Sequence, residues 1–213
     1  MKYLLKLYKE NKAFVIPYLL FVILALTARF LYDKASVHIF INSHNSPIAD
    51  QIFYYLTYLG TGWALIVAIV LLVFVKRGTA GGLLLSGLVM NLVVQTLKYS
   101  IESFRPVRYF AFYVQDYSLH LVEGVKMHYV HSFPSGHAAT AFAIFFFLSG
   151  LTKNNVLKFT FFVIALAIAF SRVYLSQHFL LDIVAGSAIG VLSSTLGLWW
   201  TDKYPQVLSR ERK

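Results

Sequence analysis

The sequence is built around long apolar runs, each about as long as a bilayer is thick. A helix needs roughly 20 residues to cross the hydrocarbon core. Apolar runs lie at about 13–32, 52–75, 80–101, 136–151, 157–174 and 179–200. Only 13% of the residues are charged and the mean hydropathy is +0.66, so a soluble domain of this length would lack the polar residues to cover its core. We therefore predict an all-α, polytopic membrane protein in which six transmembrane helices form a bundle.

Lysine and arginine are unequally divided between the two ends of these runs. One side has twelve: Lys2, Lys6, Lys9, Lys12, Lys76, Arg77, Lys153, Lys158, Lys203, Arg210, Arg212 and Lys213. The other side has seven: Arg29, Lys34, Lys98, Arg105, Arg108, Lys126 and Arg172. The positive-inside rule places the richer side, with both termini, in the cytoplasm. All seven histidines fall on the outer side, which predicts that any chemistry takes place at the outer face.

The rest of the chain is predicted to add one interfacial helix and one outer loop to a single domain, residues 1–213. The segment 1–12, MKYLLKLYKENK, has no small-residue cleavage site, and its lysines form a stripe suited to an anionic leaflet. Residues 107–133 are expected to form the outer loop. The net charge is +10, but the lysines and arginines that carry it flank the apolar runs and do not cluster on a soluble domain. This distribution argues against a nucleic-acid partner. The absence of cysteine excludes disulfides and thiolate zinc sites.

The third apolar run ends in polar residues, in the segment NLVVQTLKYSIESFRP. Its polar residues recur every three or four positions, a spacing that predicts one shared helical face. This polar stripe consists of Asn91, Gln95, Lys98, Glu102 and Arg105. Pro106 follows and is expected to stop the helix. Lysine and arginine at a helix end commonly extend toward the membrane interface, which would explain Lys98 and Arg105 without a functional role. The polar stripe, however, continues along the helix through Asn91 and Gln95, and this favours a polar cavity.

A second polar cluster, SFPSGHAAT at residues 132–140, opens the fourth run. Pro134 and Ser135 are predicted to begin a helix, with Ser135 as its cap. The first backbone N–H groups of that helix, next to Gly136, form a ready site for an anion. The letters PSGH alone are also compatible with an ordinary helix start, so the role of His137 depends on what lies near it.

The third cluster, SRVYLSQHFLLD at residues 171–182, joins the fifth and sixth runs. A spacing of four places Asp182 one helical turn from His178, where the carboxylate can accept one ring N–H and fix the tautomer. A lone His178 would be interpreted as structural, whereas Asp182 and the nearby Arg172 favour a functional role. Gly186 and Gly190 continue the same face and allow a neighbouring helix to approach closely.

Together, the clusters provide three cations, a helix N-terminus, two histidines and one carboxylate at the outer face. Three cations and backbone donors match what a phosphate dianion and its trigonal transition state require. A histidine oriented by an aspartate is suited to act as a nucleophile, and the second histidine is suited to act as a general acid. The predicted reaction class is therefore phosphoryl transfer.

These stretches resemble the signature of the type 2 phosphatidic acid phosphatase superfamily, membrane-bound branch, whose pattern is K-x6-R-P, P-S-G-H and S-R-x5-H-x3-D. The matching residues are Lys98, Arg105, Pro106, Pro134, Ser135, Gly136, His137, Ser171, Arg172, His178 and Asp182. The resemblance implies that His178 attacks phosphorus and forms a phosphohistidine, that Asp182 orients it, and that His137 protonates the leaving oxygen. It also implies that no metal or cofactor takes part, and that the phosphoryl oxygens are held by Lys98, Arg105, Ser135, Gly136 and Arg172.

The resemblance further implies a phosphatase or pyrophosphatase of lipid metabolism that acts at the outer face of a bacterial inner membrane. Undecaprenyl pyrophosphate is the favoured substrate, as in small bacterial members, and phosphatidylglycerophosphate, phosphatidic acid and lipid A are alternatives. A lipid phosphotransferase on the same scaffold is a further alternative. A non-catalytic phospholipid-binding or transport protein would not need the His178–Asp182 pair. The loop histidines His120, His128 and His131 are expected to be ordinary surface residues, with a metal site as the alternative.

Overall fold

Helices form all the regular structure of the described residues, 2–75 and 77–204 of the computed structural model, apart from one isolated bridge between Phe104 and Val130. They are α1 (Lys2–Glu10), α2 (Lys12–Leu31), α3 (Lys34–Ser43), α4 (Pro47–Leu56), η1 (Thr57–Gly60), α5 (Gly62–Val75), α6 (Arg77–Ser100), α7 (Pro106–Tyr113), α8 (Gly136–Leu151), α9 (Asn155–Tyr174) and α10 (Leu180–Lys203). The predicted all-α fold is confirmed.

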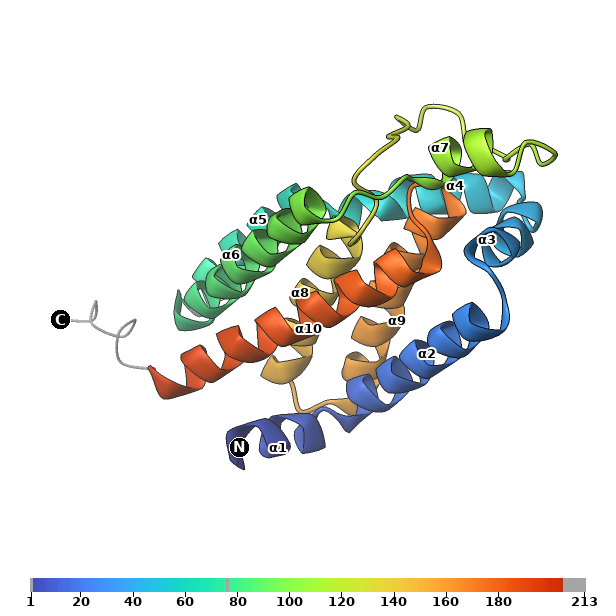
Figure 1. The fold of residues 1–213 in the computed structure, drawn as a ribbon. Helices are drawn as coiled ribbons and strands as arrows, with labels where there is room; N and C mark the ends of the chain where they lie inside the picture. Colours follow the sequence, from blue (N-terminus) through green and yellow to red (C-terminus); the bar gives the residue numbers. More distant parts are fainter. Residues whose placement is uncertain (1, 76, 205–213) are drawn as a thin grey trace.

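Helix α10 lies at the centre of the bundle, where it packs against α8, α6, α2 and α9 (Figure 1). Two glycines bring α10 into close contact with α8. A Cβ atom at Gly186 would lie 2.3 Å from the carbonyl oxygen of Ser135, and a Cβ at Gly190 would lie 2.3 Å from that of Ala139. No larger side chain fits at either position without moving the α8 backbone. The predicted close approach at these glycines is therefore observed, and it fixes the start of α8 against the start of α10.

Aromatic side chains fill the space between α2, α8 and α9. Phe14 of α2 is fully buried, and its ring meets those of Phe146, Phe162 and Phe142 edge to face, at centroid distances of 5.2, 5.7 and 6.1 Å. Aromatic pairs prefer this geometry because the positive edge of one ring faces the negative face of the other. The packing holds α8 inside the bundle, so its first turn is a fixed platform.

Four helices of the described chain are long and apolar enough to cross a membrane, namely α2, α6, α9 and α10. The bent pair of α4–η1 with α5 makes a fifth if it is counted as one span, and α8 is an apolar helix of 16 residues. Apolar side chains of α2 such as Ile23 and Leu24 are exposed, as contact with lipid requires. The six-span count and the orientation stay predictions. Of the charges that set the orientation, Lys76, Arg210, Arg212, Lys213 and the side chain of Lys2 lie outside the described residues.

The predicted span over 52–75 is not one straight helix, because the chain is broken there and bent by 58°. Helix η1 ends at Gly60, Thr61 is extended, and α5 begins at Gly62. Two glycines so close together weaken a helix, since glycine loses the most backbone entropy on folding. Gly60 is also pressed against α8, because a Cβ there would lie 3.0 Å from the carbonyl oxygen of His137. The break therefore brings the chain against the first turn of α8.

Helices α3, α4 and α7, with residues 114–135, cover one end of the bundle, which we call the capped end (Figure 1). The predicted outer loop 107–133 thus contains most of a helix. The expectation that Pro106 stops the preceding helix is wrong: α6 ends at Ser100, and Pro106 begins α7, at a position where its missing N–H costs nothing. Glu102 and Arg105 consequently lie beyond α6. The predicted stripe is helical only at Asn91, Gln95 and Lys98.

Helix α1 occupies most of the predicted interfacial segment 1–12. Its Leu7 is buried in the core, and the hydroxyl of Tyr8 lies 3.1 Å from Oγ1 of Thr195 on α10. Lys6 and Lys9 are exposed. The helix is therefore docked on the bundle with these lysines outward, and its contact with a membrane surface stays a prediction.

Candidate active site

The three polar clusters meet at the capped end, where α6 ends and α8 and α10 begin. The backbone N–H of Ser135 donates to the carbonyl oxygen of Asp182 at 2.9 Å, which ties the second cluster to the third. Lys98 Nζ donates to the carbonyl oxygen of His131 at 2.8 Å, and Nδ1 of His131 lies 2.9 Å from the carbonyl oxygen of Lys98. This reciprocal contact ties the first cluster to the segment just before the second.

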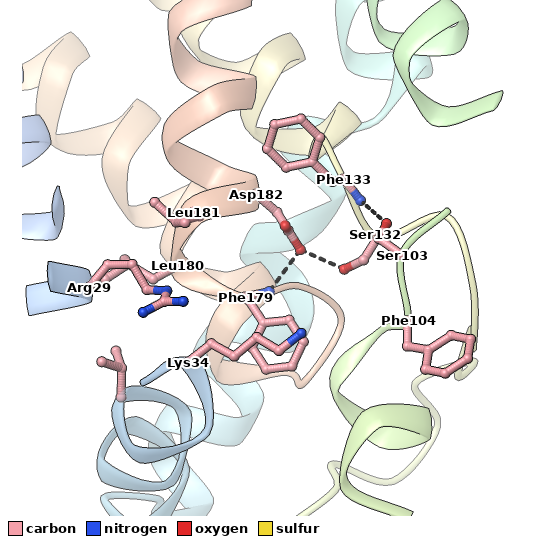
Figure 2. A pocket seen from close by; sticks show the side chains of 11 residues that line it. Arg29, Lys34, Ser103, Phe104, Ser132, Phe133, Phe179, Leu180, Leu181 and Asp182 are labelled. Carbon is pink, nitrogen blue, oxygen red and sulfur yellow. Dashed lines mark hydrogen bonds between the residues drawn. The ribbon is translucent and has the colours of Figure 1, made fainter. Parts of the chain in front are cut away.

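His178 and Asp182 form a buried pair at the start of α10. Nδ1 of His178 lies 3.3 Å from Oδ2 of Asp182, and the two residues are only 2% and 6% exposed. The same carboxylate oxygen accepts from the hydroxyl of Ser132 at 2.5 Å and from the backbone N–H of Phe179 at 2.9 Å (Figure 2). These contacts fix the carboxylate. The carboxylate in turn orients the imidazole, with Nδ1 toward Asp182 and Nε2 on the far side of the ring.

His178 is neutral at pH 7. Burial lowers its pKa to about 3; the hydrogen bond to Asp182 opposes this shift, and the nearby charges of Arg105 and Arg172 add to it. A neutral imidazole that donates from Nδ1 carries a lone pair on Nε2. This is the form that a histidine nucleophile requires.

The turn that carries His178 is held from several sides. Ser176 has a φ of 52°, in the left-handed region that residues other than glycine rarely enter. The backbone N–H groups of Gln177 and His178 donate to the carbonyl oxygen of Arg172, at 2.9 and 3.0 Å. The Ser176 hydroxyl lies 3.1 Å from Nε2 of His38, a buried residue of α3. Helix α3 therefore braces the strained turn, since strain of this kind persists only where surrounding contacts hold it.

Gln177 joins two of the predicted phosphate-binding cations. Its side-chain oxygen accepts from Nη1 of Arg105 at 3.3 Å and from Nη2 of Arg172 at 3.4 Å. Arg105 also donates to the backbone oxygens of Val130 and Gln177, at 3.0 and 3.1 Å, and Arg172 donates to the hydroxyl of Thr57 at 2.7 Å. All these acceptors are neutral, so the contacts position both guanidinium groups without cancelling their charge.

Direct ion pairs with the described residues do not balance the charge of the three cations. In residues 2–75 and 77–204, no carboxylate forms a salt bridge with Lys98, Arg105 or Arg172. Within the same residues, Nε of Arg172 is buried and has no hydrogen-bond partner. Buried cations held near one another are costly unless an anion joins them. The arrangement is therefore suited to an anion such as a phosphoryl group.

The first turn of α8 faces the same site. Ser135 is its N-cap, as predicted, and its hydroxyl accepts a backbone hydrogen bond from the first turn at 3.4 Å. A Cβ atom at Gly136 would meet only Val94, at 3.8 Å, so packing does not require glycine there and the space beside it is open. His137 comes next, and His178 and the three cations act on it electrostatically. The site thus brings together the catalytic and phosphate-binding residues predicted from the sequence, whereas Glu102 has no contact with it that the structure shows.

A groove of about 520 Å³ leads away from this site between α5, α6 and α8. Lys98, Gly136 and His137 line its end at the site. Most of the remaining wall is apolar and includes Leu65, Ile66, Ile69, Leu84, Leu88, Met90 and Val94. Asn91 and Gln95 lie on the same wall, so the stripe borders a cavity as predicted, although that cavity is more apolar than expected. A charged end and an apolar length match the shape of a lipid with a phosphate headgroup.

Sequence reasoning missed Gln177, Ser132 and Thr57. Gln177 stands directly before His178, and Ser132 opens the stretch SFPSGHAAT, so both lie inside clusters that the sequence singled out. Their partners are distant in sequence and therefore could not be inferred from spacing. Thr57 stands in an apolar run and has no sequence signal that marks it as functional.

The three loop histidines do not share a site. His120 is half-buried and lies 3.0 Å from the Asp50 carboxylate on α4, so it fastens the loop and is more than a surface residue. His131 contacts Lys98, and His128 is exposed. Across the part of the chain that the structure describes, no group of three or more histidine, aspartate or glutamate side chains is placed to hold a metal ion.

The profile of the PAP2 superfamily matches residues 79–205, which are more than half of the chain and include all three clusters. The chain belongs to the PAP2 superfamily. The family expected from the sequence is confirmed. This PAP2 protein is similar to the lipid A 4'-phosphatase of Porphyromonas gingivalis, with 26% identity over 157 residues, 71% of this chain and 66% of that protein. The chain spans less than two thirds of the length of the curated relatives it matches.

Two solved structures share the fold of this PAP2 protein. Aquifex aeolicus LpxE is 27% identical, with a TM-score of 0.67 over 78% of this chain and 94% of that one. The first transmembrane PAP2-type phosphatidylglycerolphosphate phosphatase of Bacillus subtilis is 25% identical, with a TM-score of 0.62 over 96% of this chain and 100% of that one. Together with its apolar helices, this likeness identifies the PAP2 protein as a multi-pass membrane protein.

Proposed function

We propose that this PAP2 protein is a metal-independent lipid phosphatase that hydrolyses the phosphate headgroup of a membrane lipid through a phosphohistidine at His178. The observation that carries the proposal is the buried His178–Asp182 pair beside three cations, which have no carboxylate partner among the described residues. The apolar groove that ends at the same point supports a lipid substrate. The names of the similar phosphatases support it as well.

In the proposed first step, the lone pair on Nε2 of His178 attacks phosphorus, and the bond between phosphorus and the lipid oxygen breaks. His137 donates a proton to that leaving oxygen, so the lipid departs as a neutral alcohol. Asp182 keeps the Nδ1 proton in a hydrogen bond and stabilises the positive charge that the ring acquires when its Nε2 is phosphorylated.

In the second step, water attacks the phosphorus of the phosphohistidine, and the bond between phosphorus and Nε2 breaks. His137, now deprotonated, accepts a proton from the attacking water, which restores both histidines and releases phosphate. Lys98, Arg105 and Arg172, with the Ser135 hydroxyl and the Gly136 N–H, would hold the three non-bridging oxygens in both steps. Cations held in place before the reaction favour the transition state because they need not reorganise as charge develops.

The lipid substrate is proposed from the relatives and the groove. Lipid A and phosphatidylglycerolphosphate rank first, because phosphatases named for them align with most of this chain. Undecaprenyl pyrophosphate, favoured from the sequence, and phosphatidic acid follow. Release of phosphate by the purified protein from each of these four lipids tests the proposal. Turnover of at least one supports a lipid phosphatase, and no release from any of them would contradict it.

The position of the site relative to the membrane is proposed from charge. The capped end contains the site residues, while Lys153 in the loop between α8 and α9 and Lys158 near the start of α9 lie at the opposite end. We place the capped end at the outer face of a bacterial inner membrane, following the positive-inside rule. The substrate headgroup would then be in the outer leaflet.

Gln177→Glu is expected to lower kcat/KM roughly 100-fold, about the cost of losing one oxyanion donor. A carboxylate between Arg105 and Arg172 would pair with both guanidinium groups and compete with the phosphoryl oxygens. Gln177→Leu is the matched control, because it removes the acceptor without adding charge and should cost less. Phosphate release and inhibition by orthovanadate measure both variants. Equal losses in the two variants would show that the neutrality of residue 177 is unimportant.

Turnover is expected to survive an excess of EDTA. The proposed reaction takes its positive charge from Lys98, Arg105 and Arg172, so removal of divalent ions should change the rate less than twofold. The measurement is phosphate release before and after chelation and dialysis. Loss of turnover with EDTA, followed by recovery with magnesium or zinc, would show that the side-chain cations are not sufficient.

A further inference from the structure

A second cavity lies beside Asp182 and shares no lining residue with the groove. We call it the rear cavity; it has a volume of about 170 Å³. It is bounded by the end of α2, the start of α3, the first turn of α10, and the segments 103–104 and 132–133 (Figure 2). Two cations, Arg29 and Lys34, line it together with apolar side chains. Neither cation has a role in the proposed reaction.

Among the residues that the structure describes, the two cations have no anionic partner at hydrogen-bonding distance. Arg29 donates to the carbonyl oxygen of Tyr32 at 3.2 Å, and the Lys34 ammonium lies over the rings of Tyr109 and Phe179, at 3.9 and 4.9 Å from their centroids. In the described parts of the chain, no salt bridge involves either residue. Figure 2 shows both side chains directed toward the space beside α10. Their charge is therefore available to a ligand.

Nearby carboxylates are already engaged. The side chain of Asp33 caps α3, where it accepts from the backbone of Ala35 and from the backbone and hydroxyl of Ser36. Asp182 forms part of the cavity wall, but its Oδ2 accepts from His178, Ser132 and Phe179. Burial lowers the pKa of Lys34; Asp182 opposes this shift and Arg29 adds to it, so all three charges act on one another. Two cations thus face one carboxylate, whose Oδ2 is already held by other donors.

The cavity lies where an apolar helix ends. Arg29 is in the last turn of α2, a helix long enough to span a membrane, and the neighbouring Phe30, Leu31 and Tyr32 are 89%, 64% and 60% exposed. Exposed aromatic residues beside a cation at the end of a span are typical of the level of the lipid headgroups. Phosphate is the anion that is abundant at this level.

We propose that the rear cavity binds a lipid-borne phosphate through Arg29 and Lys34, separately from the phosphate that reacts at His178. Two lipids can supply this chemistry. One is a neighbouring anionic phospholipid of the bilayer, and the other is a substrate that carries a second phosphate. In either case the apolar wall, which includes Val37, Leu180 and Leu181, would contact the hydrocarbon part of the ligand.

The first arm of the test measures binding without turnover. The full chain in detergent is titrated with phosphatidylglycerol, and zwitterionic phosphatidylcholine, whose net charge is zero, is the reference; retained lipids are counted by native mass spectrometry. Each cation near the membrane surface contributes to the binding free energy of an anionic lipid. Lys34→Gln and Arg29→Gln should therefore each weaken phosphatidylglycerol retention about fivefold. Lys126→Gln removes one charge from an exposed loop position at the same end and should leave retention unchanged.

The second arm identifies the source of the phosphate. KM is measured for lipid A with two phosphates and with one, in wild type and in Lys34→Gln. A rise in KM of about fivefold for the doubly phosphorylated form alone assigns the cavity to the second phosphate of the substrate. If Lys34→Gln weakens lipid retention but leaves KM unchanged for both forms of lipid A, the rear cavity is assigned to a bilayer lipid. If Lys34→Gln and Arg29→Gln match wild type in both arms, the proposal is wrong. The retention measurement tests the rear cavity even if the protein hydrolyses no lipid, because it does not depend on turnover.

Discussion

His178→Ala is expected to abolish phosphate release from every substrate, with a loss on the order of a million-fold. The variant lacks the nitrogen that would form the bond to phosphorus. Losses of this size are typical when one member of a concerted catalytic unit is removed. The measurement is single-turnover phosphate release at saturating lipid, for both lipid and aryl phosphate substrates.

Because His178 is buried, the alanine variant could also lose activity through misfolding. His178→Asn keeps a polar side chain next to Asp182 but has no nucleophilic nitrogen, so it should be equally inactive while its thermal unfolding midpoint stays close to that of wild type. Either variant, folded and retaining more than about 1% of wild-type turnover, would exclude His178 as the nucleophile.

His137→Ala is expected to lower turnover by about 100- to 10,000-fold on a lipid phosphate, the usual contribution of a general acid. The deficit should shrink strongly on p-nitrophenyl phosphate, because nitrophenolate is a good leaving group that needs little protonation. The informative quantity is the ratio of alkyl to aryl phosphate activity, compared between His137→Ala and wild type.

The same ratio also detects an exchange of roles between the histidines. His178→Ala should be inactive on both substrates, because the nucleophile is needed whatever the leaving group. If His137→Ala is inactive on both and His178→Ala keeps its aryl phosphatase activity, the two roles are reversed. Near-normal turnover of lipid by both variants would place the reaction elsewhere in the protein.

The positions of the long helices could be predicted from the sequence because each coincides with a long apolar run. The run at 136–151 coincides with α8, and the third, fifth and sixth runs overlap α6, α9 and α10. The short helices of the capped end were missed although their start signals are present. Asp33 caps α3, and Ser46 with Pro47 opens α4. A search for spans passes over elements that are too short to cross a bilayer.

The site was predictable in its residue types and less so in its contacts. The spacing of four between His178 and Asp182 is local, and the expected pair is present. The bridge from Gln177 to Arg105 depends on how the chain crosses the capped end, which no local pattern encodes. The rear cavity is harder still, because Arg29 and Asp182 come from opposite ends of the sequence. Only the packing of α2 and α3 beside α10 brings them together.

The claim that His178 becomes phosphorylated is tested most directly by trapping the intermediate. The protein is mixed with a lipid carrying a radiolabelled phosphate, quenched with alkali within milliseconds, and digested for peptide mapping. We expect label on the peptide that contains His178, in a linkage that is stable to alkali and labile to acid, as a phosphoramidate is. Label should be absent from His178→Ala. An acid-stable phosphoester on another residue, or rapid turnover with no labelled protein at any time, would contradict the account.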